Sequence, residues 1–355
     1  MRFRTHWLIL LLFLSLITAC KKPVNPTTET FIRGADLSKL PELEKAGVVY
    51  YNSKGIEQNA LEIFKANGLN TVRIRLWVHP SGTNSSLPEV IAFAKRIHKV
   101  GLKVWLDLHY SDTWADPGHQ TKPEAWKNLN FTQLEDSVYR YTLHVVRIIH
   151  PEYVQIGNEI NHGFLWEDGR ISHPTQFTAL LQKGTSAVRY ADTSIRIILH
   201  YPGYKGADWF FGLIAKYHVN YDIIGLSYYP WWHGKSLDTL QLTLNHLSEK
   251  YGKKVVIAET AYPFTLSWND GINDIVGETS QLIPGYPATE TGQKAFLWKL
   301  KTLVQGCPDG EGFCYWEPEW ASVKSPQSTV GSPWENLALF DFRNKVLPAM
   351  SVFQP

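Results

Sequence analysis

The chain has 355 residues, of which 44% are hydrophobic and 19% charged, and its formal net charge is +2. Disordered, collagenous and low-complexity proteins are excluded because the apolar content is ordinary and the net charge small. Arg2 and Arg4 lie in a leader without acidic residues, so residues 20–355 hold 33 basic and 33 acidic side chains. Without a basic surplus, we expect no nucleic-acid partner. The 14 tryptophans either fill a core or line a groove for flat apolar faces.

The first residues have the layout of a bacterial lipoprotein leader. The apolar run from Trp7 to Ile17 follows two arginines and is shorter than the about 20 residues that span a bilayer. It ends in Ile-Thr-Ala-Cys20, which resembles a lipobox. We therefore predict a lipoprotein signal peptide over residues 1–19 and a polar tether over 20–30, with Cys20 lipidated. The protein would then be exported and lipid-anchored to a bacterial membrane, on its outer or periplasmic face. The alternative is an ordinary signal peptide with an incidental cysteine.

Export changes the interpretation of the other two cysteines. Cys307 and Cys314 form an even pair in an oxidising compartment, and Pro-Asp-Gly-Glu-Gly between them has the composition of a turn. We predict a disulfide between them, provided that the geometry of the turn allows it.

From residue 31 onward, short β-branched or apolar runs alternate with longer segments of helical period. The predicted strands are residues 31–36, 71–77, 103–108, 153–157, 195–200, 223–227, 254–258 and 312–315. The predicted helices between them include 56–67, 88–100, 131–149, 174–190, 236–251 and 290–304. Eight such units predict an α/β fold, a single (β/α)₈ barrel with enlarged loops over residues 31–355. A doubly wound sheet is the alternative, but no Gly-rich phosphate turn follows the first strand.

Polar and aromatic residues crowd the carboxyl ends of these strands, where barrel enzymes place their chemistry. Asp36 follows strand 1, Arg75 ends strand 2, and Asn158-Glu159 follow strand 4. Glu259 follows the apolar run of strand 7. Polar residues at the ends of so many strands are hard to explain by packing of the hydrophobic core.

Glu159 and Glu259 each follow an apolar strand, which predicts two facing, partly desolvated carboxyl groups. Cleavage of a glycosidic bond needs this pair, one protonated to donate to the leaving oxygen and one ionised. Asn158 adds an amide for the sugar hydroxyl next to the reacting carbon, and Arg75 is predicted to hold the nucleophile ionised. The alternative is a pair of rim carboxylates in structural ion pairs.

Several strings make the resemblance specific: FIRGADLS, NTVRIRLWVHP, GLKVWLDLHYSDTWADPGHQTKPEAW, VQIGNEINHGFLW, IGLSYYPWWHG, VVIAETAYPF and FCYWEPEW. They resemble the endo-β-1,4-galactanases of glycoside hydrolase family 53, in one order over about residues 31–355. The resemblance implies Glu159 as acid/base, Glu259 as nucleophile and net retention of configuration. It implies β-1,4-galactan, from type I arabinogalactan or pectin side chains, as substrate.

An endo-acting enzyme holds several sugars along a cleft, and pyranose faces stack on indole and phenol rings. Ten aromatic residues at or after strand ends are candidates, about half of which we expect to pack under their own loops. The predicted aromatic contacts are Tyr110, Trp114, Trp126, Trp166, Tyr228, Trp231, Trp232, Trp316 and Trp320, with Trp77 as a further rim residue. The predicted polar contacts are Asp36, Arg75, His109, Asp112, Asp116 and Asn158. Trp105 and Trp298 are predicted core residues.

No cofactor is expected for catalysis. His109, His162 and His233 lack the spacing of a zinc site. The long connection after strand 7, from residue 261 to about 289, carries hard oxygen ligands, and some bacterial relatives hold calcium there. We name Asp270 and Asp274 as candidate ligands of a structural Ca²⁺ ion, although the spacing is not that of an EF-hand. A solvated polar loop is the alternative.

Two other functions fit parts of the pattern. The catalytic pair does not encode the identity of the sugar, so a related glycanase acting on mannan, xylan or glucan is one alternative. A surface lipoprotein that captures glycans without cleaving them is the other, and the intact pair Glu159 and Glu259 argues against it. We expect a monomer that contacts the membrane only through its lipid anchor.

Overall fold

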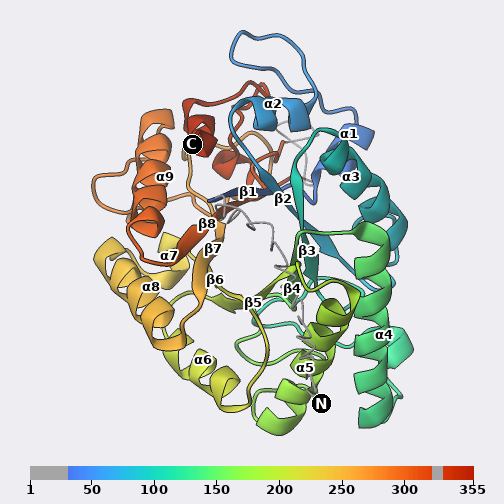
Figure 1. Ribbon diagram of the computed structural model, residues 1–355. Helices are drawn as coiled ribbons and strands as arrows, with labels where there is room; N and C mark the ends of the chain where they lie inside the picture. Colours follow the sequence, from blue (N-terminus) through green and yellow to red (C-terminus); the bar gives the residue numbers. More distant parts are fainter. Residues whose placement is uncertain (1–30, 322–330) are drawn as a thin grey trace, which may run out of the picture. The chain divides into compact units, whose positions relative to one another are not determined.

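Eight parallel strands close into a barrel in the computed structural model, which describes residues 31–321 and 331–355 (Figure 1). Each strand pairs with the next, and β8 pairs with β1. The strands are β1 Ile32–Asp36, β2 Thr71–Leu76, β3 Lys103–Leu108, β4 Tyr153–Ile156, β5 Arg196–Pro202, β6 Ile223–Ser227, β7 Lys254–Thr260 and β8 Gly310–Trp316. The predicted (β/α)₈ barrel is confirmed, and each predicted strand end lies within two residues of the observed one.

Helices surround the barrel and cover the outer face of its strands (Figure 1). They are α1 Leu40–Lys45, α2 Ala60–Ala66, α3 Leu87–Lys99, α4 Phe131–Ile149, α5 Pro174–Ala191, α6 Ala207–Lys216, α7 Pro230–His233, α8 Leu237–Tyr251 and α9 Glu290–Gln305. Short 3-10 turns are η1 Glu124–Trp126, η2 Thr279–Gln281, η3 Glu335–Leu337 and η4 Pro348–Phe353. None of the helices in the described ranges is both long and apolar enough to cross a membrane.

Local sequence explains where the helices begin and end. The α4 helix matches the prediction because Asn130 and Gln133 form a capping box and His150 ends the helix in a left-handed conformation. In contrast, α2 begins later than predicted, because the Asn59 side chain accepts a hydrogen bond from the Leu61 amide and caps the helix there. The α6 helix was not among the helices named from the sequence; ADWFFGLIAK is apolar at most positions, which does not distinguish a buried helix from a strand.

The segment after β8 departs from regular alternation. Among its described residues, which exclude 322–330, it forms 3-10 turns and no α-helix. The η4 turn takes the place of a covering helix: Phe353 stacks on Phe313 of β8, with ring centroids 5.9 Å apart, and meets Phe64 of α2 at 6.1 Å. The last turn of the chain therefore seals the outer layer between β8 and α2.

The apolar core has two parts, one inside the barrel and one between strands and helices. The inner part takes side chains from every strand except β2: Ile32, Trp105, Tyr153, Ile198, Ile223, Val256, Ala258 and Cys314. On β2 the inward position is held by Arg73, whose guanidinium carbon lies 5.9 Å from the centre of the Trp105 ring. Trp105 is fully buried, as predicted, and Trp298 is partly buried on α9.

The predicted disulfide is wrong, because Cys307 and Cys314 are both free and buried. Cys314 points into the barrel, whereas Cys307 belongs to the outer core behind α9. A turn does follow Cys307, closed by a hydrogen bond from the Gly310 amide to the Cys307 carbonyl oxygen, but residues 310–316 are strand. The extended strand from Gly310 to Cys314 carries the chain about 13 Å away from the turn, whereas a disulfide spans a Cα separation of at most about 7 Å.

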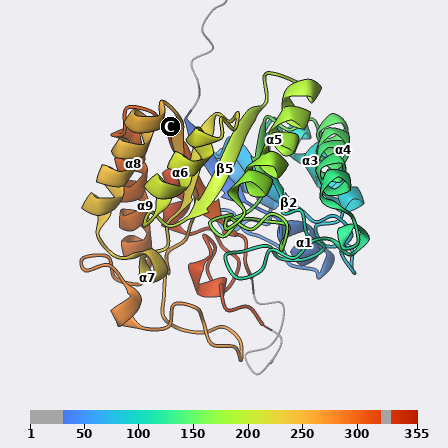
Figure 2. The same ribbon diagram turned by 90° about the horizontal axis from the view of Figure 1, so that it is seen from below.

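Long loops gather at one side of the barrel, at the lower edge of Figure 2. They include residues 109–130 after β3 and residues 261–289 after β7, the long connection that the sequence predicts. The predicted signal peptide and tether, with Cys20, lie outside the described residues. The loop side is the carboxyl end of the strands, and it holds the candidate site.

Candidate active site

A cavity of about 660 Å³ opens at the carboxyl ends of the strands. Its walls combine acids, two arginines and a set of aromatic rings. The lining residues are Asp36, Arg73, Arg75, Asp107, His109, Trp114, Ala115, Asp116, Pro117, Asn158, Glu159, Asn161, Pro202, Tyr229, Trp232, His233, Glu259, Trp316 and Trp334. Residues from almost every strand end meet here, as a barrel requires.

Two glutamates face each other across this cavity. Glu259 lies in β7, and Glu159 follows β4 after Gly157, which has a φ of 78°. Glu159 itself has a φ of 48°, a left-handed conformation that is uncommon for a non-glycine residue and typical of functional sites. Carboxyl oxygens of the two glutamates and a ring nitrogen of His200 lie within 4.8 Å of one another. The carboxyl groups are therefore close enough to act on one bond.

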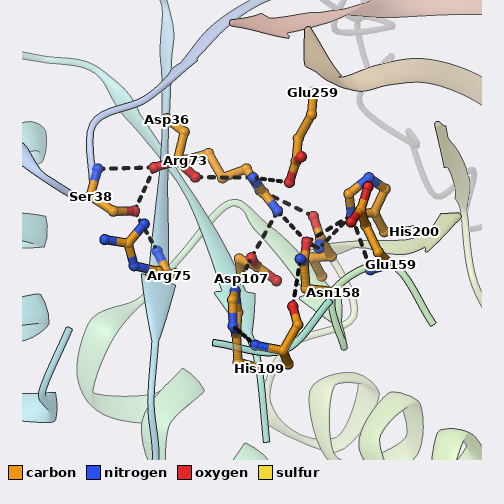
Figure 3. Close-up of polar contacts among 12 residues, drawn as sticks. Asp36, Ser38, Arg73, Arg75, Asp107, His109, Asn158, Glu159, His200 and Glu259 are labelled. Atoms are coloured by element: carbon orange, nitrogen blue, oxygen red, sulfur yellow. Dashed lines mark hydrogen bonds and ion pairs between the residues drawn. The ribbon is translucent and has the colours of Figure 1, made fainter. Parts of the chain in front are cut away.

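Arg73 is the cation at the centre of the site (Figure 3). Its Nη1 donates to Glu259 Oε1 at 2.8 Å and to Asp36 Oδ2 at 3.0 Å. Its Nη2 donates to Asp107 Oδ2 and to Asn158 Oδ1, both at 2.8 Å. A guanidinium has this fixed fork of donors, so Arg73 sets the position of three carboxylates at once.

Arg75, which the sequence analysis assigned to the nucleophile, has a different role. Its guanidinium pairs with Glu317, and its Nε donates to Ser85 Oγ at 3.0 Å. It lies 4.0 Å from the centre of the Trp114 ring, at the edge of the cavity. Residues two apart on a strand share a face, so both arginines point inward, and the deeper Arg73 reaches Glu259. The assignment to Arg75 is corrected accordingly.

Hydrogen bonds distinguish the two glutamates. Glu259 accepts from Arg73 and from the Tyr229 hydroxyl, which donates to Oε2 at 3.0 Å. Glu159 accepts a hydrogen bond from the Ser227 hydroxyl at 2.6 Å and no cation pairs with it among the described residues. Desolvation raises the pKa of both carboxyl groups above the ordinary range, while Arg73 opposes that rise. Because Arg73 contacts Glu259 directly, this contact favours the ionised form at Glu259 over the ionised form at Glu159.

Among the described residues, Glu159, His200 and Glu259 lie close enough together to hold a metal ion. A metal ion would balance the negative charge of the carboxylates, but Arg73 already supplies a positive charge 2.8 Å from Glu259. This group is therefore better described as an acid–base site.

Over nearly its whole described length, the chain is similar to proteins of one known family. The model of glycosyl hydrolase family 53 matches residues 32–353, nearly the whole described chain. The chain belongs to glycoside hydrolase family 53. Its relatives include the arabinogalactan endo-beta-1,4-galactanase of Cellvibrio japonicus, 36% identical over 91% of this chain and 90% of that protein. The endo-beta-1,4-galactanase of Bacillus subtilis is 34% identical over 94% of this chain and 87% of its own length.

A solved structure from the same family has the same fold as this chain. The GH53 catalytic domain of Ignisphaera aggregans superimposes with a TM-score of 0.87 at 37% identity, covering 94% of this chain and 98% of that one. The resemblance drawn from the sequence motifs is therefore confirmed, and the protein is a glycoside hydrolase of family 53.

Within this family 53 fold, the structure brings ten of the predicted site residues to the cavity. They are Asp36, Arg75, His109, Trp114, Asp116, Asn158, Glu159, Trp232, Glu259 and Trp316. Asn158 is fixed by donating from Nδ2 to the Ala115 carbonyl oxygen at 2.9 Å, which leaves its second N–H for a ligand. His109 accepts from the Ala115 amide at 3.1 Å and contacts Asp107 at 3.0 Å.

Tyr110 and Tyr228 point away from the cavity, so their assignment to substrate is wrong. Tyr110 is 1% exposed, and its hydroxyl contacts Thr142 of α4 at 2.7 Å. Tyr228 is fully buried and donates to the Gly234 carbonyl oxygen at 3.0 Å. Side chains alternate along a strand, so the cavity residue is the neighbour in each case, His109 and Tyr229.

Five other predicted contacts lie outside the cavity lining. Asp112 accepts from the backbone amides of His79 and Glu124 and so ties two loops together. The four tryptophans pack against neighbouring side chains or the backbone: Trp126 on Tyr141, Trp166 on Arg170, Trp231 on Trp334, and Trp320 beneath Lys39. These rings support the loops that carry the cavity wall, as we expected for about half of the set.

The cavity residues that had no role assigned from the sequence include Arg73, Asp107, Tyr229 and Trp334. The alternation of inward side chains on β2 could have identified Arg73 beside Arg75. The position of Trp334, far along the chain from β8, carries no local sequence signal.

The candidate calcium residues lie in the long loop after β7. Asp274 is 8% exposed, and neither of its carboxyl oxygens accepts a hydrogen bond from the part of the chain that the structure describes. Burial raises its pKa to about 8, with further contributions from Glu335 and Asp270. Asp270 accepts from the Ile272 and Ser332 amides at 2.7 Å. Buried carboxylate oxygens without donors fit a hard cation such as Ca²⁺.

Proposed function

We propose that the protein is a retaining endo-β-1,4-galactanase that cleaves the galactan of type I arabinogalactan and pectin side chains. Two relatives over most of the chain carry galactanase names. The observation that carries the mechanism is the approach of Glu159 and Glu259 to within 4.8 Å. Retaining glycosidases have carboxyl groups about 5–5.5 Å apart, whereas inverting ones need about 6.5–9.5 Å to admit a water.

In this mechanism each glutamate has a distinct task. Glu259, held ionised by Arg73 and Tyr229, attacks the anomeric carbon and forms a covalent glycosyl-enzyme. Glu159 gives its proton to the departing glycosidic oxygen, and the ionised Glu159 then removes a proton from the water that releases the sugar. Two displacements on one carbon restore the original configuration. The chemistry requires no cofactor, because both proton transfer and nucleophilic attack come from side chains.

The aromatic wall supports cleavage within a long chain. Trp114, Trp316, Trp334 and Trp232 follow one another with ring centroids 6.4, 4.2 and 5.9 Å apart. Trp114 is 41% exposed and Trp232 55% exposed. A row of accessible indoles offers stacking surfaces for successive pyranose rings, which an enzyme that removes single terminal sugars does not need.

Incubation with β-1,4-galactan beside mannan, xylan and cellulose tests the proposed substrate. We expect galactan alone to yield a ladder of oligosaccharides. Glu159→Gln and Glu259→Gln should each abolish cleavage while galacto-oligosaccharide binding stays measurable by calorimetry. Cleavage of mannan or xylan in preference to galactan would indicate the alternative glycanase, and binding without cleavage by the wild-type protein would indicate a glycan-capturing protein.

We further propose a structural Ca²⁺ ion in the loop after β7, with Asp274 as its principal ligand and Asp270 beside it. The orphaned oxygens of Asp274 support this site. A bound cation would replace the proton that Asp274 otherwise holds near neutral pH.

The lipid anchor at Cys20 is a proposal that rests on the leader sequence. Labelling of expressing cells with an alkyne fatty acid should tag the wild-type protein, and Cys20→Ala should remove both the tag and the membrane association. An untagged protein in the membrane-free fraction would favour an ordinary signal peptide.

A further inference from the structure

The Ser227 hydroxyl lies between two groups that can accept its single proton. Its Oγ is 2.6 Å from Glu159 Oε1 on one side and 2.9 Å from His200 Nε2 on the other. Ser227 is fully buried at the end of β6, and His200 is fully buried in β5. A hydroxyl carries one proton and two lone pairs, so Ser227 donates to one of these partners at a time.

The tautomer of His200 follows from the hydrogen bonds around Asn158. Arg73 Nη2 donates to Asn158 Oδ1 at 2.8 Å, and Asn158 Nδ2 donates to the Ala115 carbonyl oxygen, so the orientation of this amide is determined. His200 Nδ1 lies 2.9 Å from the same Oδ1, which can only accept.

Two donors also approach His200 Nδ1, the Gln155 side-chain amide at 3.1 Å and the Glu159 backbone amide at 3.4 Å. The Gln155 amide has other acceptors, the Gly157 carbonyl oxygen at 3.0 Å and Asn158 Oδ1 at 3.2 Å. Because Asn158 Oδ1 is the nearest neighbour of Nδ1 and cannot donate, Nδ1 carries the ring proton, and Nε2 presents a lone pair toward Ser227.

The local charges keep this ring neutral. Burial lowers the pKa of His200 well below its usual value, and Arg73 lowers it further. Titratable groups facing the ring come from β2, β7, α7 and the ends of β3 and β4: Arg73, Asp107, His109, Glu159, His233 and Glu259. His109 and His233 also lower this pKa, whereas Asp107 raises it and is itself paired with Arg73. Nε2 is therefore an acceptor over the pH range in which Glu159 titrates.

We infer that Ser227 is a positioning residue that acts as a two-position proton switch for Glu159, an inference that rests on the proposed acid/base role of that glutamate. With Glu159 protonated, its O–H donates to Ser227 Oγ, and the Ser227 O–H donates to His200 Nε2. With Glu159 ionised, the Ser227 O–H turns and donates to Glu159 Oε1. Only the hydroxyl rotates, while the Nδ1–H of His200 keeps donating to Asn158 Oδ1.

The proton balance follows the two steps of the reaction. In the first step the Glu159 proton passes to the leaving glycosidic oxygen, the C–O bond to that oxygen breaks and the bond to Glu259 forms. In the second step the ionised Glu159 takes a proton from water as the water oxygen replaces Glu259 on the anomeric carbon. Ser227 turns once in each direction, so Glu159 has a hydrogen-bond partner in both charge states.

Ser227 and its acceptor His200 must then shift the pKa of Glu159 in opposite directions. Removing the hydroxyl deprives ionised Glu159 of a charge-assisted bond, which is stronger than the neutral bond lost with the protonated form. Ser227→Ala should therefore raise that pKa, by roughly 0.5–1. Without the His200 acceptor, the Ser227 hydroxyl can donate its hydrogen bond only to Glu159. His200→Leu should therefore lower the pKa by a similar amount, and His200→Gln, whose amide oxygen can accept, should restore it.

The pKa of Glu159 can be measured without substrate, by ¹³C NMR of protein labelled at the glutamate side-chain carboxyl, with the signal assigned by its loss in Glu159→Gln. The alkaline limb of the pH dependence of kcat/KM on galactan should move with it in each variant. Ser248→Ala, which removes a fully buried hydroxyl bonded to Asp309, is the matched control and should leave both unchanged.

Opposite displacements in Ser227→Ala and His200→Leu support the switch, whatever the polysaccharide proves to be. Displacement in the same direction, or none in either variant with the fold intact by circular dichroism, would overturn it. Failure of the proposed function gives a different result: wild-type protein without galactan cleavage, while the carboxyl titration still shifts in opposite directions.

Discussion

The Arg73 guanidinium and the Glu259 carboxylate meet at 2.8 Å inside the mouth of the barrel, with both side chains almost fully buried. The same guanidinium binds Asp36 and Asp107, so three carboxyl groups share one cation. A buried ion cluster of this kind contributes little net stability over an apolar core, but loss of one partner leaves uncompensated charge. Arg73 thus links the charge state of the nucleophile to the integrity of the barrel mouth.

Arg73→Met should both destabilise the protein and abolish cleavage. Breaking a buried ion pair costs about 3–5 kcal/mol, and Glu259, without its cation, is expected to stay protonated at neutral pH. Thermal unfolding and galactan hydrolysis check the two effects. A variant with wild-type turnover would show that Arg73 does not control the nucleophile.

Arg75→Met should act on binding rather than on chemistry. Arg75 lies 4.0 Å from the Trp114 ring and pairs with Glu317, without contact to either catalytic carboxyl group in the described structure. The variant should also lose stability, because Glu317 is left buried without its partner. Below its melting temperature we expect KM for galactan to rise several-fold, with a smaller change in kcat, because a stacking contact of this type is worth about 0.5–2 kcal/mol. A loss confined to kcat would contradict this role.

The alkaline limb of the pH profile should report Glu159. Desolvation raises its pKa, so the acid form persists above the usual carboxyl range and activity falls as pH rises past that raised value. With a dinitrophenyl galactobioside, which needs no proton on its leaving group, Glu159→Ala should lose the alkaline limb while glycosylation continues. Glu124→Gln, on the exposed η1 turn, is the matched control. An unchanged alkaline limb in Glu159→Ala would assign the acid elsewhere.

Calcium should stabilise the protein more at pH 8 than at pH 5. The folded-state pKa of Asp274, about 8, lies above its unfolded value. Its contribution to stability in metal-free protein is therefore present at low pH and is lost as pH rises toward 8. Ca²⁺ at 100 times its Kd adds about 2.7 kcal/mol, a Tm increase of a few degrees by calorimetry against EDTA. Asp274→Asn should lose this response, whereas Asp238→Asn, exposed at the start of α8, should keep it.

Reducing agent should leave Tm unchanged, because Cys307 and Cys314 are free. Both thiols are buried, and burial raises the pKa of each, so neither should react with a thiol reagent until the protein unfolds. Titration in denaturant should find both of them. A fall in Tm with dithiothreitol would show that the two are bonded after all.

The sequence was sufficient for the barrel, because eight buried parallel strands give apolar runs that local patterning reveals. It was also sufficient to place Glu159 and Glu259 at strand ends. Which neighbour faces the cavity was harder: Tyr228 was chosen where Tyr229 contacts Glu259. One residue reverses the direction of a side chain, and strand ends from sequence are uncertain by about that much.

Other features depend on distances that no local pattern contains. The side chain of Arg73 is long enough to reach Glu259 from a deeper layer, which its position beside Arg75 did not reveal. The two cysteines are near in sequence, but β8 begins between them and directs Cys314 into the barrel. Trp334 joins the aromatic wall from beyond the eighth strand, so only the folded chain brings it to the cavity.

The central claim is that Glu159 and Glu259 cleave galactan by double displacement. ¹H NMR of the reducing ends as wild-type enzyme releases them from β-1,4-galactan tests it most directly, because the anomeric signals resolve before mutarotation mixes them. We predict that the β anomer appears first and that the α anomer grows in only by mutarotation. Initial release of the α anomer would contradict retention and the assignment of Glu259 as the nucleophile.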